Sequence, residues 1–180
     1  MIYYYALLAV IAVERLLEMI VSKANARWSF ARGGHEAGQE HFPAMVLLHS
    51  CFLVGCAVEP WLSGRTELPA AAPLAFALAL SCQGLRWWCI ATLGRQWNTR
   101  VIVVPGLARV GNGPYRLVRH PNYLAVVVEG IALPAIGGAW ITAVLFTACN
   151  ACLLRTRLDT ENRALLMLQQ GDDHGLGIGA

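Results

Sequence analysis

Residues 123–154 read YLAVVVEGIALPAIGGAWITAVLFTACNACLL, an apolar stretch of 32 residues. A helix needs about 20 apolar residues to cross a bilayer, so this stretch is too short for two perpendicular spans and a turn. Pro134 and Gly137-Gly138 interrupt it near the middle. The pattern predicts a tight helical hairpin with short arms. Either these arms do not fully cross the membrane, or they pack beneath neighbouring helices. Such a hairpin brings Tyr123 close to Arg155.

The rest of the chain is similarly hydrophobic. Of its 180 residues, 57% are hydrophobic and 14% are charged, against about 25% charged in a typical soluble domain. Further hydrophobic helices are predicted at 2–21, 43–62 and 70–93. We therefore expect an all-α polytopic membrane protein with about five helices, forming a single domain. Its parts are three N-terminal membrane helices at 1–93, a loop, hairpin and C-terminal helix at 94–170, and a disordered tail at 171–180.

Basic residues are distributed unevenly along the chain. The loop after the second predicted helix holds only Arg65, whereas the segments after the first, third and last helices are rich in arginine. By the positive-inside rule, the N-terminus lies outside and the central loop and C-terminus lie in the cytoplasm. The net charge of +3 then reports membrane topology, and no nucleic-acid partner is expected. The expected location is a bacterial inner membrane.

Polar residues crowd the start of the hairpin in the stretch Gly113-Pro114-Tyr115-Arg116-Leu117-Val118-Arg119-His120-Pro121-Asn122-Tyr123. Pro121 suits the first turn of a helix, and the free N–H groups of that turn can hold an anion. Two interpretations are open. The cluster forms a binding site, or its Tyr, His and Arg residues anchor a helix end at the membrane interface.

Charged residues after the hairpin form a second candidate. Arg157 and Glu161 are four residues apart and share one helical face. Without other partners they would form a surface ion pair that stabilises the helix by about 0.3–0.5 kcal/mol. The hairpin brings this face beside His120, which favours a functional role.

Three charges in the first predicted helix are unusual at membrane depth. Glu14 and Glu18 lie one turn apart with Arg15 between them. They either pair structurally, with Arg86 or Asn98 as partner, or line a substrate cavity. The stretch Trp97-Asn98-Thr99-Arg100 is likewise either a membrane anchor or the floor of the site near His120.

Metal and redox sites are not predicted. The segment from Gly33 to His41 holds two His and two Glu, but their spacing matches no common zinc pattern and the segment is typical of a solvated loop. The six cysteines all lie in apolar blocks, where small buried hydrophobes are the better interpretation.

The C-terminal half, from about Trp97 to Leu168, resembles the isoprenylcysteine carboxyl methyltransferase family of integral-membrane methyltransferases. The resemblance rests on Gly113-Pro114-Tyr115, on Arg119-His120-Pro121-Asn122-Tyr123, and on Arg157 followed by Glu161. The first half, with Glu14-Arg15-Leu16-Leu17-Glu18 and Gly33-Gly34-His35-Glu36, resembles a bacterial branch associated with methylating alkylpyrones.

The resemblance implies an S-adenosyl-L-methionine cofactor bound on the cytoplasmic side. Its pocket would be lined by Leu107, Ala108, Arg109, Val110, Tyr115, His120, Pro121, Asn122, Tyr123 and Glu161. Arg157 would face the substrate and act in catalysis, and Glu14 and Glu18 are further candidates for substrate contact. Family members often carry a second acidic residue after the Glu, where this chain has Asn162.

The expected reaction is O-methylation of an anionic oxygen, a carboxylate or acidic enol, on a lipophilic small molecule that reaches the enzyme from membrane lipid. An alkylpyrone and an isoprenylcysteine both fit. Two alternatives stay open. One is a membrane reductase of the steroid-reductase type that uses NADPH, although here the next acid after Tyr123 is Glu129, six residues on. The other is a non-enzymatic lipid carrier. The sequence does not indicate an oligomeric state.

Overall fold

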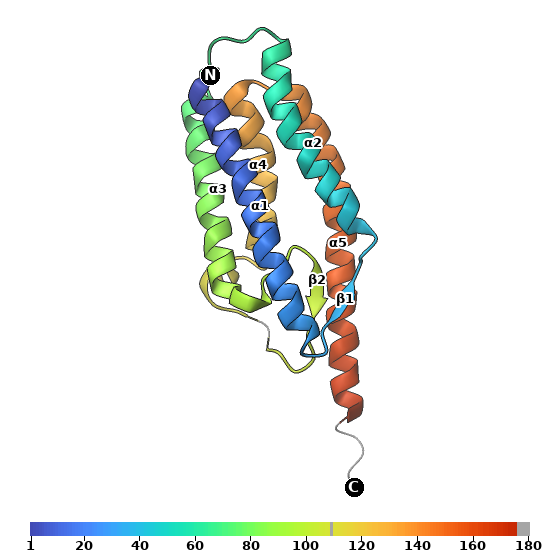
Figure 1. Ribbon diagram of the computed structural model, residues 1–180. Coiled ribbons are helices and arrows are strands. Elements are labelled where there is room, and N and C mark those ends of the chain that lie inside the picture. Colours follow the sequence, from blue (N-terminus) through green and yellow to red (C-terminus); the bar gives the residue numbers. More distant parts are fainter. Residues whose placement is uncertain (109, 176–180) are drawn as a thin grey trace.

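The computed structural model describes residues 1–108 and 110–175, with side chains as far as Glu161. Within these residues, five long helices run side by side as a bundle (Figure 1). They are α1 (Ile2–Phe30), α2 (His41–Leu62), α3 (Ala72–Leu93), α4 (Pro121–Gly137) and α5 (Trp140–Gly175). The shorter elements are β1 (His35–Ala37), β2 (Val101–Val103) and the 3-10 helices η1 (Gly94–Gln96) and η2 (Gly113–Arg116). The predicted all-α fold is confirmed.

The outer surface of the bundle is that of an integral membrane protein. Three helical stretches are long and apolar enough to cross a bilayer, namely His41–Leu62, Ala72–Gln96 and Trp140–Glu161, and Pro121–Gly137 is a shorter apolar helix. Large apolar side chains such as Leu47, Leu74 and Val144 point outward and are more than half exposed. A surface of this kind is stable only against lipid or a protein partner.

α1 presents one continuous stripe to the bundle, and this stripe changes character along its length. Its buried members recur at spacings of three, four or seven residues, as expected for one helical face. They are Tyr4, Leu8, Ile11, Glu18, Ser22, Asn25 and Ser29, with Ala26 buried beside Asn25. The first three join the apolar core with Phe52 and Leu133. Apart from Ala26 the later members are polar, so the interior is apolar where α1 begins and polar where it ends.

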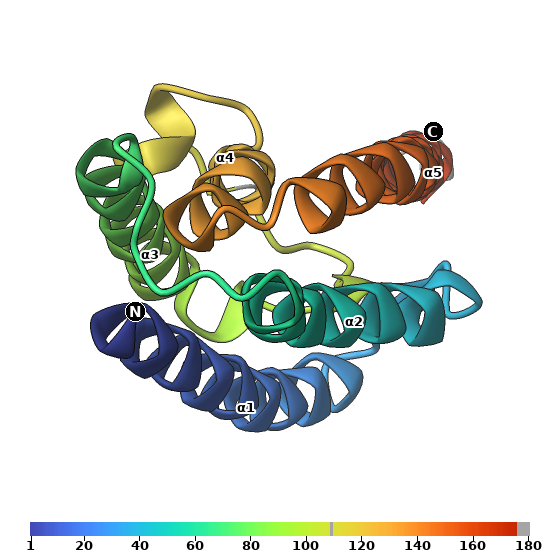
Figure 2. The same ribbon diagram turned by 90° about the horizontal axis from the view of Figure 1, so that it is seen from above.

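α4 and α5 form the predicted hairpin, with α4 lying between α3 and α5 (Figure 2). Gly138 ends α4 in the left-handed conformation at φ 74°, which favours glycine. Gly137 lies against the Tyr4 ring, where a side chain would collide. The turn thus reaches the end of the bundle where α1 begins, rather than stopping short of it. The second arm is long enough to cross a bilayer because α5 continues as one helix beyond Leu154, and its apolar stretch runs from Trp140 to Glu161.

The segment between α1 and α2 differs from its prediction. It was expected as a solvated loop, but His35–Ala37 forms β1, which pairs antiparallel with β2, Glu36 lying opposite Ile102. The β-branched run at 101–104 indicated an extended segment, whereas the three residues of β1 gave no such signal. This small sheet lies beside α5 (Figure 1) and ties the end of α1 to the central loop.

Candidate active site

Two cavities adjoin where α4 begins. The first, which we call the bundle cavity, has a volume of about 310 Å³ and lies between α1, α2, α4 and α5. The second, the loop cavity, has a volume of about 260 Å³ and lies between the end of α1, β2, η2 and the start of α4. Residues that line both are Trp97, Asn98, Arg100, Val101, Asn122, Tyr123 and Arg157. The cavities therefore meet at one set of side chains, which we call the shared wall.

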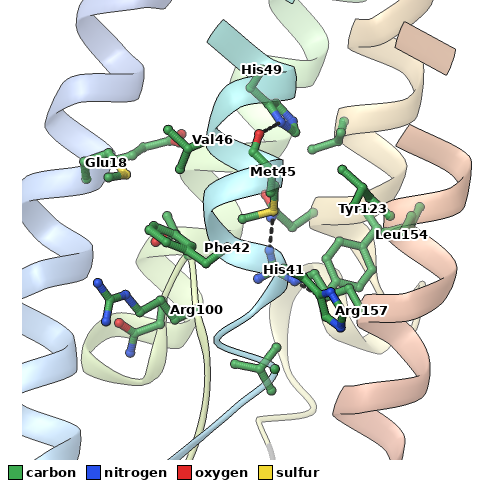
Figure 3. Close-up of a pocket in the computed structure, with 18 of the residues that line it drawn as sticks. Glu18, His41, Phe42, Met45, Val46, His49, Arg100, Tyr123, Leu154 and Arg157 are labelled. Atoms are coloured by element: carbon green, nitrogen blue, oxygen red, sulfur yellow. Dashed lines mark hydrogen bonds between the residues drawn. The ribbon is translucent and has the colours of Figure 1, made fainter. Parts of the chain in front are cut away.

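Tyr123 and Arg157 of the shared wall are hydrogen-bonded to each other and, through Tyr123, to Glu161 of the loop cavity. The Tyr123 hydroxyl donates to Glu161 Oε2 at 2.8 Å and accepts from Arg157 Nε at 2.9 Å. Arg157 Nη1 also contacts the Met45 sulfur at 2.8 Å, as Figure 3 shows. Thioether sulfur is a weak acceptor, and a guanidinium has five N–H donors. Arg157 therefore keeps donors for an anion from either cavity.

His120 completes this group from the loop side. Its ring stacks on Tyr123, with centroids 5.3 Å apart and planes 13° from parallel. Its Nδ1 lies 3.9 Å from Glu161 Oε1, within the range of an ion pair when the ring is protonated. The structure thus brings His120, Arg157 and Glu161 together, as the predicted hairpin required: His120 directly precedes α4, and the other two belong to α5.

The first turn of α4 offers fewer free N–H groups than predicted. Pro121 has no N–H, and the N–H groups of Tyr123 and Leu124 both donate to the His120 carbonyl. Among the described residues this leaves the Asn122 N–H as the free donor of the turn. An anion site built from several amides is therefore not formed at this end of α4.

Three polar atoms around the loop cavity are buried without a hydrogen-bond partner among the described residues. They are Asn122 Oδ1, Asn98 Nδ2 and Trp28 Nε1. Buried polar atoms in native proteins are almost always paired, and an exception calls for an explanation such as a bound molecule. Two donors and one acceptor lining one cavity indicate a polar ligand that supplies the complementary groups.

The remaining predicted cofactor residues are placed as follows. Leu107, Ala108, Val110 and Tyr115 line the loop cavity, as do His120 and Glu161. Pro121 is fully buried and lines neither cavity. Arg109 lies outside the described residues.

Tyr115 is held at the loop cavity by a turn that requires glycine. Gly113 begins η2 at φ 56°, and a Cβ there would collide with Thr92 on α3. Burial raises the pKa of the Tyr115 phenol well above its ordinary value. Like an ordinary tyrosine, the phenol is neutral near neutral pH and keeps its O–H proton.

The charges of α1 divide between structure and cavity. Glu18 accepts from Arg86 Nη2 at 2.6 Å and from Arg15 Nη1 at 3.0 Å, so Arg86 is the predicted partner that is confirmed. Glu18 also lines the bundle cavity. Glu14 lies elsewhere: its Oε1 accepts from the Trp87 indole at 3.1 Å, and it lines neither cavity.

Sequence reasoning did not assign Trp28, and it left Arg100 open as part of either a membrane anchor or the floor of the site. Trp28 reaches the loop cavity from the last turns of α1, a position where an aromatic residue is typical of an interfacial anchor. Arg100 lies in the shared wall, 3.3 Å from Glu36 of β1 and over the ring of Phe42. The pairing of β1 with β2 positions Arg100, and the sequence carried no clear signal for that pairing.

Comparisons with known proteins place the chain in a family. The model of the isoprenylcysteine carboxyl methyltransferase (ICMT) family matches residues 74–167, which include most of the loop cavity and the whole α4–α5 hairpin turn. The uncharacterized protein YpbQ of Bacillus subtilis (strain 168) is 35% identical over 162 residues, covering 90% of this chain and 96% of its own length. No solved structure matches.

Proposed function

Because the chain belongs to the isoprenylcysteine carboxyl methyltransferase family, we propose that it is an integral-membrane O-methyltransferase that uses S-adenosyl-L-methionine. Its substrate is a lipophilic molecule with an anionic oxygen, a carboxylate or an acidic enol. The observation that carries this proposal is the shared wall, which brings a polar loop cavity and a largely apolar bundle cavity together at Arg157 and Tyr123.

The loop cavity fits S-adenosyl-L-methionine by its donors and acceptors. The cofactor carries a carboxylate and ribose hydroxyls, which accept hydrogen bonds, and ammonium and amino groups, which donate them. Asn98 Nδ2 and Trp28 Nε1 supply unpaired donors, and Asn122 Oδ1 supplies an unpaired acceptor. Tyr115, His120 and Glu161 would hold the cofactor from the other side of this cavity.

Arg157 is the group that holds the substrate anion. Its guanidinium is oriented by Tyr123 and, through Tyr123, by Glu161. When bound, S-adenosyl-L-methionine supplies a methyl group on a positively charged sulfur, which the substrate oxygen accepts to leave S-adenosylhomocysteine. A carboxyl group is already ionised near neutral pH, so the chain needs no general base. Its own contribution is positioning and the exclusion of water.

The bundle cavity suits the apolar part of the substrate. Its walls between Arg157 and the middle of the bundle include Met45, Val126 and Leu154. Leu16 of α1 and Val46 of α2 line the cavity and are also exposed on the outer face of the bundle. We infer that a lipophilic molecule enters between α1 and α2 from the membrane.

We also propose an orientation in the membrane and two suitable acceptors. Arginine is frequent at the end of the bundle that carries the site, so we place the site on the cytoplasmic side of a bacterial inner membrane. An alkylpyrone and an isoprenylcysteine are both suitable acceptors, because each joins an acidic oxygen to an apolar chain.

Purified protein in lipid nanodiscs tests the proposal. We expect transfer of a labelled methyl group from S-adenosylmethionine to at least one member of a panel containing an alkylpyrone, an isoprenylated cysteine and a fatty acid. Calorimetry should show binding of S-adenosylhomocysteine and none of NADPH. Binding of NADPH alone, or an absence of methyl transfer to every acceptor, would contradict the proposal.

The reductase alternative is not favoured by the structure. In a reductase of this type, the acidic residue that follows Tyr123 would have to be Glu129. Glu129 instead accepts a hydrogen bond from Gln83 at 2.9 Å and lies 3.7 Å from Arg15. Glu129 lines neither the loop cavity nor the bundle cavity. For a non-enzymatic carrier, His120→Ala or Glu161→Ala should leave lipid binding unchanged, and no methyl transfer should occur.

A further inference from the structure

The inner part of the bundle cavity is polar, although it lies deeper among the helices than Arg157. Asn150 of α5 and His49 of α2 both line it. We call this pair the deep subsite. Asn150 lies seven residues before Arg157, which puts the two side chains on the same face of α5, two turns or roughly 10 Å apart. Leu153 and Leu154 line the cavity between them.

Asn150 has an amide that the protein itself does not satisfy. The residue is 6% exposed, and its side chain makes no hydrogen bond to another described residue. Asn150 lines the bundle cavity, so its amide can be reached from there. Its amide is therefore buried in the protein, unpaired, and reachable from the bundle cavity. A group of this kind in a lipid-facing cavity is costly unless a bound molecule pairs with it.

His49, on the neighbouring helix α2, supplies the complementary group in the same cavity. Its Nδ1 lies 2.9 Å from the Met45 carbonyl, and because a carbonyl only accepts, Nδ1 carries the proton. In the neutral ring the other nitrogen is then an acceptor. The ring packs edge-on against Phe146, one turn before Asn150, with centroids 5.3 Å apart. Figure 3 shows His49 in the pocket, separated from Arg157 by Met45.

The charges around the deep subsite indicate a neutral ligand group. Arg15, Arg86 and Glu18 line the bundle cavity, and Glu129 lies with His49, Arg15 and Arg86 around a small separate cavity. Together these four charged side chains carry two positive and two negative charges. These groups are paired with one another at 2.6–3.7 Å. No charge in this described cluster is left to neutralise an ionic ligand. A hydroxyl, in contrast, can donate to His49 and accept from Asn150.

We propose that the deep subsite recognises a second, neutral oxygen function on the substrate. This inference rests on the proposed function, in which Arg157 holds the methyl-accepting oxygen. The substrate class is then a lipophilic acid or enol that carries a hydroxyl or carbonyl group further along its chain. A plain alkyl or prenyl tail would leave the Asn150 amide unpaired, and a site built to hydrogen-bond a hydroxyl discriminates against analogues that lack it.

Binding of matched acids tests the proposal without depending on catalysis. The probes are ω-hydroxy fatty acids of about six to twelve carbons, a range that brackets the two-turn separation of Asn150 and Arg157. Each is compared with the plain acid one carbon longer, in which a methyl group replaces the hydroxyl. By calorimetry in nanodiscs, we expect one chain length at which the hydroxy acid binds at least about tenfold more tightly. Equal affinities throughout the series, or no binding of any acid, would overturn the proposal.

Variants then assign the preference to Asn150. Asn150→Leu should abolish the preference for the hydroxyl while retaining binding of the plain acid. Thr147→Val, an exposed position on the same helix, should keep the preference. Thermal unfolding shows whether each variant is folded. If a variant is not folded, the comparison of hydroxy and plain acids in the unmodified protein still tests the proposal.

The proposed function and the deep subsite can fail separately. A protein that prefers the hydroxy acid but transfers no methyl group would contradict the methyltransferase and leave the subsite intact. Methyl transfer with equal efficiency to both acids of every pair would support the methyltransferase and overturn the subsite.

Discussion

Arg157 contacts both cavities, and its side chain is held in place before any substrate arrives. The Tyr123 hydroxyl accepts a hydrogen bond from Arg157 Nε and donates one to Glu161. We predict that Arg157→Gln lowers methyl transfer about 10- to 100-fold, because a hydrogen bond to a charged group contributes about 1.5–3 kcal/mol. The lower rate of methyl transfer should be measured at limiting lipophilic substrate. The affinity of the variant for S-adenosylhomocysteine should stay within a few-fold of that of the unmodified protein.

The matched control is Arg155→Gln, on the same helix but exposed. It should transfer methyl groups as the unmodified protein does. Similar losses in both variants would show that the effect is the general loss of a positive charge near the membrane rather than contact with substrate.

Asn122 tests the loop cavity at the same scale. Its buried Oδ1 has no partner among the described residues, so a ligand there would be its first hydrogen-bond partner. We predict that Asn122→Leu weakens S-adenosylhomocysteine binding up to about tenfold, the value of one hydrogen bond of about 0.5–1.5 kcal/mol. Calorimetry measures this directly. Asn112→Leu, at an exposed position before η2, is the control, and unchanged affinity in Asn122→Leu would remove this residue from the cofactor site.

At the scale of elements, α5 is capped by a side chain from a different helix. Both carboxylate oxygens of Glu59 in α2 are used: Oε1 accepts from the Ile141 N–H, and Oε2 accepts from the N–H and hydroxyl of Thr142. A carboxylate at a helix N-terminus satisfies free N–H groups and interacts favourably with the helix dipole. Glu59 thereby joins α2 to the hairpin.

Removing this cap should destabilise the bundle without altering the chemistry. We predict that Glu59→Ala lowers the free energy of unfolding by about 1–2 kcal/mol, as other N-cap losses do. Thermal unfolding in detergent is the measurement. Glu67→Ala, exposed in the following loop, should leave the unfolding temperature unchanged. An equal shift in the two variants would mean that net charge, not capping, is responsible.

At the scale of the whole molecule, the buried charges join three helices. Glu18 of α1 binds Arg86 of α3, and Gln83 links Arg15 to Glu129 of α4. Removing one member of a buried pair leaves the other charge uncompensated, which costs about 3–5 kcal/mol, whereas replacing both with apolar residues is often neutral. The network therefore links α1 to α3 and α4 through side chains.

A double-mutant comparison checks this interpretation. Arg86→Met should strongly lower the unfolding temperature, and Glu18→Met with Arg86→Met should recover most of the loss. If the double variant is instead as unstable as the single one, the two residues do not act as a pair. Substrate contact by Glu18 stays a prediction, and a raised KM in a stable double variant would support it.

The amino-acid sequence determined the membrane class, the five helices and the α4–α5 hairpin. These depend on local hydrophobicity and on helix-breaking residues such as Gly138, which act through nearby parts of the chain. The hairpin in turn was enough to predict that His120 and Glu161 lie together. Only the tertiary structure decided that Trp28 and Asn98 face the loop cavity, that β1 pairs with β2, and that Asn150 and His49 share one cavity. These relations join residues tens of positions apart, and the packing that brings them together leaves no periodic signal in the sequence.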